Sequence, residues 1–328
     1  MFLLGWNWII SPLMKEGTVI KSTGSWYHVR SEDKLWECRI KGRIRLEGIK
    51  STNPVSVGDV VDFEPEEGEG DKGVITAIHD RRNYIVRKSV NLSKRTHVIA
   101  ANLDQAILIA TLEFPKTYPR FIDRFLLTAE AYDIPGVLVF NKYDLYSDEM
   151  LDELEYLSIV YRDAGYKVLT TSAANGHGME AFREMLKDKT SLLSGHSGVG
   201  KSTLINYLEP GLDLKTERIS DTHLQGQHTT TFAEMHELGF GGYIIDTPGI
   251  RGFGLVDMEK EEIGDYFPEI FRLKSECRFH NCLHLEEPGC AVKEAVENAR
   301  LPLSRYESYV ALVEGLDEDD TYRTDQYN

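Results

Sequence analysis

Four short motifs stand in an unusual order along this chain, and that order limits the folds it can adopt. Asn-Lys-Tyr-Asp at residues 141–144 comes first, and Thr-Ser-Ala at 171–173 follows it. Gly-His-Ser-Gly-Val-Gly-Lys-Ser at 195–202 is third, and Asp-Thr-Pro-Gly at 246–249 is last. Each matches a loop with which one class of α/β domains binds nucleotides, but the usual order begins with the Gly-rich phosphate loop. With the phosphate loop numbered as motif 1 and the threonine-bearing segment 226–231 counted as motif 2, the order along this chain is 4-5-1-2-3, which predicts a circularly permuted α/β domain.

Apolar patterning predicts three structural regions. Between residues 17 and 80, short segments rich in β-branched and aromatic residues alternate with Gly, Asn and Pro, which predicts a small β-barrel such as an OB-fold. From residue 98, continuous apolar runs alternate with helical patterns, as in a parallel sheet covered on both faces. Beyond residue 254 the chain reads as helical and carries Cys and His. The expected ranges are an N-terminal extension at 1–14, the OB-fold at 15–82, a basic linker at 83–97, the α/β domain at 98–254, the Cys/His-bearing domain at 255–310 and an acidic tail at 311–328.

Charge restricts the partners that the chain can bind nonspecifically. The net charge is −16, which disfavours nonspecific contact with nucleic-acid phosphates. Residues 81–95 are the exception, because they contain six basic residues and no acidic one: Arg81, Arg82, Arg87, Lys88, Lys94 and Arg95. This run is either a solvated strand and linker or a local surface for nucleic acid.

The N-terminal residues leave two readings of the start site open. The first 13 residues are apolar but contain no Lys or Arg, so they lack the basic region of a secretory signal. Either Met1 or Met14 can be the start. Apolar runs fall short of the ~20 residues of a membrane span, and we expect a cytoplasmic protein with no membrane partner.

Residues 195–202 have the composition and the context of a phosphate loop. They follow an apolar strand and precede a helical segment, the setting that this motif requires. Glycines let backbone N–H groups wrap phosphates, and Lys201 would contact the β- and γ-phosphates. The Ser202 hydroxyl would bind Mg²⁺. The predicted nucleotide contacts here are Gly195, His196, Ser197, Gly198, Val199, Gly200, Lys201, Ser202 and Thr203, with His196 interpreted as a spacer.

The first two motifs predict that the base is guanine. The Asp144 carboxylate can accept hydrogen bonds from guanine N1–H and the exocyclic amine, donors that adenine does not present there. Lys142 would stack along the base, and Asn141 would brace the loop. In the motif that contains Ser172 and Ala173, the backbone N–H of Ala173 would meet guanine O6.

The last motif and the segment before it predict how hydrolysis is arranged. Asp246 would hold Mg²⁺ through water, and the Gly249 N–H would sense the γ-phosphate. In the segment 226–231, Thr230 is the threonine expected to close on Mg²⁺. Ile250 stands where Ras-like enzymes place a water-orienting glutamine, so either His228 orients the water or hydrolysis waits for a partner. The predicted catalytic residues are His228, Lys201 and Thr230.

Clustered cysteines predict a metal site. Cys277, Cys282, His284 and Cys290 offer three thiolates and one imidazole, the donor set of a closed, tetrahedral structural zinc site. His280 lies inside the cluster and could replace His284. We expect one structural zinc ion per chain, in addition to Mg²⁺ bound with GTP.

Together these motifs resemble the circularly permuted ribosome small-subunit-dependent GTPase A family (RsgA, YjeQ or YloQ). The resemblance rests on the permuted order, residues 195–203, His-Thr-Thr-Thr at 228–231, Asp-Thr-Pro-Gly and the Cys/His spacing. It implies an OB-fold, a permuted G domain and a zinc domain. It also implies GTP hydrolysis stimulated by the 30S ribosomal subunit late in its maturation, with 16S rRNA bound and the enzyme a monomer. Gln227 departs from the family's usual Arg or Lys, which weakens any role for a cation there.

The sequence leaves a second function open. In this alternative the chain is a GTP-gated checkpoint module that binds rRNA or the 30S subunit, and turnover is incidental. Ile250 in place of glutamine favours that reading. A small-molecule enzyme is a weaker idea, because no further catalytic constellation supports it.

Overall fold

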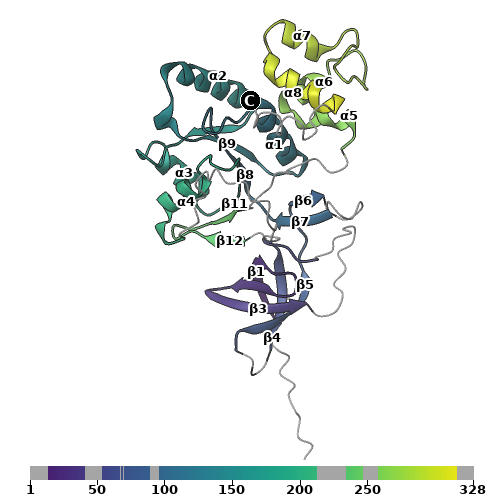
Figure 1. Cartoon of the computed structure of the whole chain (residues 1–328). Coiled ribbons are helices and arrows are strands. Elements are labelled where there is room, and N and C mark those ends of the chain that lie inside the picture. The colour runs from purple at the N-terminus through teal and green to yellow at the C-terminus, as the bar shows by residue number, and fades with distance from the viewer. Residues whose placement is uncertain are drawn as a thin grey trace, which may run out of the picture. The chain divides into compact units, whose positions relative to one another are not determined.

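The computed structural model describes residues 14–40, 54–66, 68, 70–88, 96–212, 234–246 and 258–315 (Figure 1). The chain forms two compact units. The first comprises residues 1–102 with 228–236, and the second comprises 103–227 with 237–328. Within the described ranges, no helix is both long enough and apolar enough to span a bilayer.

A closed five-stranded barrel forms most of the first unit. Its strands are β1 (Lys15–Ser22), β2 (Tyr27–Ser31), β3 (Lys34–Ile40), β4 (Val60–Pro65) and β5 (Lys72–Ile78). β1 pairs with β2 and β4, β2 pairs with β3, and β5 joins β3 to β4, which closes the sheet. Alternate residues face inward, and the Trp36 and Phe63 rings meet in the core at a centroid distance of 5.3 Å. The predicted OB-fold is confirmed.

Two further strands follow the barrel. β6 (Tyr84–Lys88) and β7 (Thr96–Ala101) form an antiparallel pair in which Ile85 and Ala100 are buried. The range 83–97, predicted as a basic linker from its charge, therefore contains strand structure. Apolar residues between the basic ones supply the buried side of the pair, a pattern that a reading of charge alone overlooks.

Arg81, counted with the basic run, has a buried and paired side chain instead. Its side chain is 4% exposed and makes a two-point ion pair with the buried Asp59, at 2.6 Å to each carboxylate oxygen. It also donates to the Pro54 carbonyl at 3.0 Å. A cation held in this way is not available to nucleic acid, so the surface proposed for residues 81–95 loses its first member.

A parallel sheet forms the centre of the second unit. Its strands are β8 (Gln105–Ala110), β9 (Gly136–Phe140), β10 (Lys167–Thr170), β11 (Thr190–Ser194) and β13 (Tyr243–Asp246). They lie in the order β10-β9-β8-β11-β13, and each neighbouring pair is parallel. The predicted doubly wound α/β domain is confirmed. In the first unit, Glu234 of β12 (Glu234–Glu237) pairs with Lys21 of β1.

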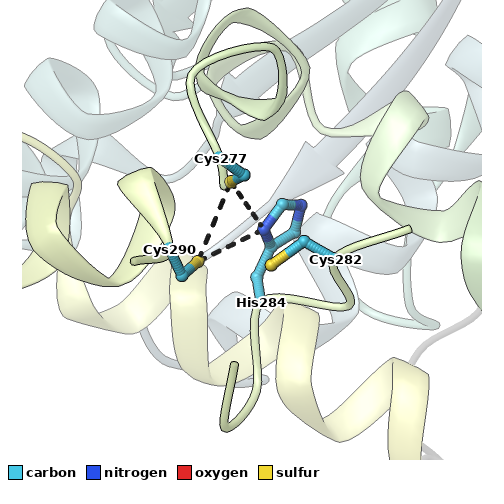
Figure 2. Close-up of side chains that lie close together, drawn as sticks. All are labelled: Cys277, Cys282, His284 and Cys290. Atoms are coloured by element: carbon cyan, nitrogen blue, oxygen red, sulfur yellow. Dashed lines mark hydrogen bonds between the residues drawn. The ribbon is translucent and has the colours of Figure 1, made fainter. Parts of the chain in front are cut away.

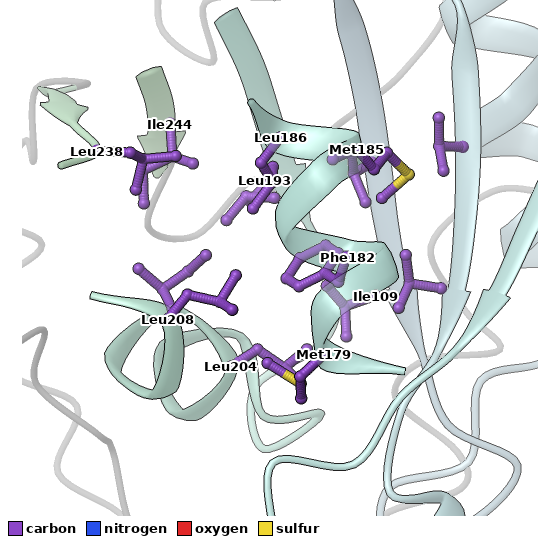
Figure 3. Packing of buried hydrophobic residues seen from close by; sticks show 14 of the residues in the cluster. Ile109, Met179, Phe182, Met185, Leu186, Leu193, Leu204, Leu208, Leu238 and Ile244 are labelled. Atoms are coloured by element: carbon purple, nitrogen blue, oxygen red, sulfur yellow. The ribbon is translucent and has the colours of Figure 1, made fainter. Parts of the chain in front are cut away.

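Helices cover both faces of the parallel sheet, which explains why its strands read as continuous apolar runs. α3 (Met179–Leu186) and α4 (Lys201–Leu208) pack on one face, where Phe182 and Leu204 meet Ile109 and Leu193 (Figure 3). α1 (Pro119–Ala131) and α2 (Asp148–Ala164) lie against β8, β9 and β10. Short 3₁₀ turns occur at Tyr143–Leu145 and Pro210–Leu212.

The C-terminal region is helical, as predicted. It contains α5 (Lys260–Ile263), a 3₁₀ turn (Gly264–Tyr266), α6 (Pro268–Lys274), α7 (Ala291–Glu297) and α8 (Leu303–Glu314). Phe267, Ile270 and Tyr309 form its core with Leu127 of α1. The region is therefore continuous with the α/β domain through α1, which lies against α8 (Figure 1).

Candidate nucleotide-binding and metal-binding sites

The carboxyl ends of the parallel strands bring the sequence motifs to one edge of the sheet. Asn141 follows β9 directly, Thr171 follows β10 and Gly195 follows β11. Because neighbouring strands are parallel, these three loops emerge from the same edge of the sheet, which we call the nucleotide edge. This is the usual place for a ligand in an open α/β sheet. Asp246 is the last residue of β13 at the same edge.

Asn141 joins the three loops. Its side chain is buried, its Nδ2 donates to the Val199 carbonyl at 2.8 Å, and its Oδ1 accepts from the Thr171 hydroxyl at 3.1 Å. The contact is close enough to require glycine at position 200, where φ is +97° and a Cβ would lie 2.5 Å from Asn141 Nδ2. One amide therefore fixes the phosphate loop against both base-side loops.

The residues predicted to read guanine lie together beside this brace. The Ser172 hydroxyl donates to an Asp144 carboxylate oxygen, and the Ala174 N–H donates to the same hydroxyl at 3.2 Å. Lys142 has a positive φ of 63°, and its ammonium donates to the Phe114 carbonyl. Burial lowers the pKa of Lys142. The carboxylate is held at the exposed rim, where a base could reach it.

The phosphate loop runs from the end of β11 into the first turn of α4. Gly195 has φ +144°, and a Cβ there would lie 2.3 Å from the Ile109 carbonyl oxygen. Lys201 Nζ donates to the carbonyls of Gly195 at 2.7 Å and His196 at 3.0 Å, so the ammonium lies over the loop. Ser202 and Thr203 occupy the first turn of α4, the end with the positive dipole.

His196 does more in the structure than separate two glycines. Its ring packs against the Phe121 ring of α1, with centroids 4.2 Å apart and the two planes tilted by 31°. Burial, aided by Lys201, lowers the pKa of His196 to about 4, so the imidazole is neutral at pH 7. A neutral ring can stack on Phe121 without adding charge beside Lys201.

The predicted metal ligands form a tight group (Figure 2). His284 Nδ1 lies 3.5 Å from Cys277 Sγ and 3.4 Å from Cys290 Sγ, and these two sulfurs are 4.0 Å apart. All four donor atoms, with Cys282 Sγ, lie within 4.8 Å of one another. Tetrahedral zinc with bonds of about 2.3 Å to sulfur and 2.0–2.1 Å to nitrogen needs separations of about 3.8 and 3.5 Å. The donors therefore fit such an ion, with His284 rather than the exposed His280 in the group.

The surrounding loop holds the donors in place. Tyr306 donates to the His284 carbonyl at 2.7 Å, and Tyr309 donates to the Leu283 carbonyl at 2.8 Å. Glu287 accepts the N–H groups of Leu283 and Leu285 at 2.8 and 2.9 Å. Burial raises the pKa of Cys282 to about 12, so thiolates here require a compensating cation. The group could hold a metal ion.

Sequence models of two regions of one family match the chain. The RsgA N-terminal domain matches residues 16–75, and the RsgA GTPase matches residues 78–256. The chain belongs to the RsgA GTPase family. It is therefore a GTPase, a hydrolase that acts on GTP.

Relatives in this family are similar over almost the whole chain. The small ribosomal subunit biogenesis GTPase RsgA of Christiangramia forsetii is 60% identical, over 95% of this chain and 99% of its own. The protein of the same name from Flavobacterium psychrophilum is 58% identical, over 95% and 96%. Two solved structures are also similar. YjeQ from Thermotoga maritima has a TM-score of 0.77 at 36% identity, covering 93% of this chain and 99% of its own. YloQ, a circularly permuted GTPase, has a TM-score of 0.70 at 32% identity, covering 92% and 94%.

Beside the nucleotide edge, this RsgA-family GTPase has a buried charge cluster that the sequence did not reveal. Arg305 of α8 is 1% exposed and donates to Glu269 and to Asp123 of α1, both at 2.6 Å. Tyr161 of α2 also donates to Asp123, at 2.9 Å. Asp123 and Arg305 are 182 residues apart in sequence, and no local pattern marks either of them.

Most of the remaining predicted site residues lie outside the part of the chain that the structure describes. His228, Thr230, Gly249 and Ile250 lie in ranges that the structure does not describe, and Asp246 is described only in its backbone. Their roles in magnesium binding and hydrolysis remain predictions.

Proposed function

We propose that this GTPase acts in biogenesis of the small ribosomal subunit, and that the 30S subunit stimulates its hydrolysis late in maturation. The relatives that carry the name small ribosomal subunit biogenesis GTPase are 58–60% identical over 95% of the chain. That likeness covers the barrel, the α/β domain and the C-terminal region together. The proposed partners are the 30S subunit and its 16S rRNA, met by the barrel and the C-terminal region of a monomer in the cytoplasm.

The main support for the proposed GTP-binding site is that Asn141 joins three loops. It links the Val199 carbonyl of the phosphate loop at 2.8 Å to Thr171 of the base-side motif at 3.1 Å. We infer that guanine is read by Asp144, Lys142, Ser172 and Ala173, and that the phosphates are held by residues 195–203. Mg²⁺ bound with GTP would be held by Ser202 and Thr230, with Asp246 acting through water, and would neutralise developing phosphate charge.

The chain's own groups then complete the proposed hydrolysis. Lys201 places a cation beside the β- and γ-phosphates, and the Gly249 N–H contacts the γ-phosphate. A neutral His228 orients the attacking water, since the Ile250 side chain offers no hydrogen bond. The Cys277, Cys282, His284 and Cys290 group holds one zinc ion whose role is structural, because four protein donors leave no open position for a substrate.

A GTPase assay titrated with purified 30S subunits tests the proposal. We expect turnover to rise with 30S concentration and to saturate, and His228→Ala to abolish most of that rise. Gln227→Ala, the neighbouring change in the same segment, is the matched control and should retain stimulation. Stimulation that survives intact in His228→Ala would refute the assigned catalytic role.

The second candidate is a checkpoint module in which hydrolysis is incidental, and Ile250 favours it. Under that reading, 30S subunits bind more tightly to the GTP-bound form but leave turnover unchanged. Sedimentation of the protein with 30S subunits in GTP and GDP, beside the turnover assay, separates the two functions.

A further inference from the structure

Helix α1 contacts two parts of this GTPase that are far apart in sequence. Phe121, in its first turn, packs its ring against that of His196 in the phosphate loop, with centroids 4.2 Å apart and planes tilted by 31°. Asp123, two residues later, accepts hydrogen bonds from Arg305 at 2.6 Å and from Tyr161 at 2.9 Å. Residues two apart on a helix point to different sides. A single turn of α1 therefore lies between the phosphate loop and the C-terminal region.

The phosphate loop needs an external support. Gly195, Gly198 and Gly200 all have positive φ values, between 85° and 144°. Glycine loses more conformational freedom on ordering than any other residue, so a loop with three of them is costly to hold in one shape. Its N–H groups must nevertheless converge on the phosphates. The contact between the His196 ring and Phe121 joins this loop to α1.

The position of α1 is in turn set from the C-terminal region. The Arg305 and Asp123 side chains are 2% and 0% exposed, and Leu127, one turn further along α1, packs in the C-terminal core. Buried charges that are paired with good geometry resist separation, because each would otherwise be left without a partner. A shift of Arg305 would therefore move Asp123 and, with it, the turn that carries Phe121.

We propose that Phe121 is a positioning residue for GTP binding, which holds the phosphate loop through His196, and that the Asp123–Arg305 pair fixes its place from the C-terminal region. The contact shapes the loop equally for bound GTP and for the transition state. Losing it should weaken GTP binding and leave kcat almost unchanged. An aromatic pair of this kind corresponds to a factor of roughly two to ten in affinity.

Phe121→Leu in the full-length protein tests the first part. We expect Kd for a fluorescent GTP analogue and KM for GTP to rise about two- to tenfold at unchanged kcat. Phe121→Tyr, which keeps a ring, should restore both. Tyr156→Leu removes an exposed aromatic from α2 and is the matched control, with no expected change.

The double variant of Phe121→Leu with His196→Ala should bind GTP no more weakly than the weaker single variant. The proposal would be overturned if Phe121→Leu bound GTP with wild-type affinity. It would also be overturned if the increase in Kd in the double variant equalled the product of the increases in the two single variants.

Asp123→Asn tests the second part. It should raise Kd for GTP when Phe121 is present and have no further effect in the Phe121→Leu background. Thermal unfolding identifies any variant that has lost its fold. Tyr161→Phe, which removes a single hydrogen bond to Asp123, is the milder alternative. Its effect on Kd for GTP is likewise compared with and without the Phe121→Leu change. If Asp123→Asn or Tyr161→Phe raised Kd for GTP equally with Phe121 and with Leu at position 121, the Asp123–Arg305 pair would not act on the phosphate loop through Phe121.

Discussion

The nucleotide edge and the metal cluster are built in opposite ways. At the nucleotide edge, Asn141 and Val199 are 58 residues apart and meet because parallel strands end together. The four residues that could hold a metal ion lie between Cys277 and Cys290, held by a loop and two helices of seven residues, α6 and α7. Helices of that length are marginal by themselves. The edge therefore depends on the sheet core, whereas we expect the C-terminal region to depend on the proposed zinc ion.

Loss of the proposed zinc ion should have the largest effect, and it should affect the C-terminal region more than the nucleotide edge. Cys290→Ala leaves three donors, and structural zinc contributes about 10–16 kcal/mol in small zinc-binding peptides at pH 7. We expect zinc content to fall from one per chain to none and α6 to α8 to lose hydrogen-exchange protection. GTP should still bind, because the sheet core contains none of the four metal-ligating residues. It should bind more weakly, because the C-terminal region supports α1. Metal analysis and hydrogen exchange measure these outcomes.

His280→Ala is the matched control for the metal cluster. His280 lies in the same loop but is exposed, so its loss should leave zinc content and exchange protection unchanged. Full protection of α6 to α8 in zinc-free Cys290→Ala would show that packing alone holds the region and would remove the contrast with the nucleotide edge.

Arg305 connects the two regions, and its removal should have the next largest effect. Arg305→Met leaves Asp123 and Glu269 buried beside an apolar chain, which typically costs about 3–5 kcal/mol. Urea unfolding at pH 7 measures the loss, and Arg300→Met, at an exposed position, is the control. A loss below about 1 kcal/mol would show that the cluster does not connect the regions.

The loss of stability caused by Arg305→Met should depend on pH. Burial raises the pKa of Asp123, and Arg305 opposes that rise. Without Arg305 the folded state favours the protonated acid more strongly than the unfolded chain does. Stability from such a group is present at low pH and lost as pH rises through the raised pKa. The loss caused by Arg305→Met should therefore be smaller at pH 5 than at pH 8.

Local pattern predicted those parts of the molecule that local chemistry determines. Alternating and continuous apolar runs gave the barrel and the parallel sheet, and the Cys/His spacing gave the group that His284 completes. The loop at 195–202 could be placed because its glycines and its flanking strand and helix are neighbours in sequence.

Long-range partners could not be predicted in this way. Arg81 reads as one of six surface cations, but it forms a buried ion pair with Asp59, 22 residues earlier. Arg305 reads as an ordinary helical charge until folding brings Asp123 beside it. Phe121 has no feature that distinguishes it from a core aromatic, because its partner His196 arrives from a different strand. Each of these depends on tertiary packing rather than on residue type.

The residues proposed to read guanine allow a test of the nucleotide edge that leaves the sheet core unchanged. Asp144→Asn should weaken GTP binding roughly five- to a hundredfold, because a charge-assisted hydrogen bond to the base corresponds to about 1–3 kcal/mol. Competition between GTP and ATP should become correspondingly less selective. Asp148→Asn, an exposed carboxylate in the first turn of α2, is the control. Unchanged competition in Asp144→Asn would refute its assignment to the base.

The smallest expected effect concerns His196 and the pH dependence of the nucleotide edge. Its pKa in the folded chain is about 4, below the ordinary 6.5, because of burial and the nearby Lys201. As pH falls, the unfolded chain takes up the proton first, so this contribution to stability is present above pH 6.5 and is lost as pH falls towards 4. Between pH 7 and pH 5 it amounts to about 1 kcal/mol, after a discount for a partly exposed ring. His196→Gln should lose correspondingly less stability over that interval in urea unfolding, while His280→Gln, in the metal loop, should follow the wild type. Parallel curves for wild type and His196→Gln would mean that the ring is solvated and that its packing against Phe121 does not keep it neutral.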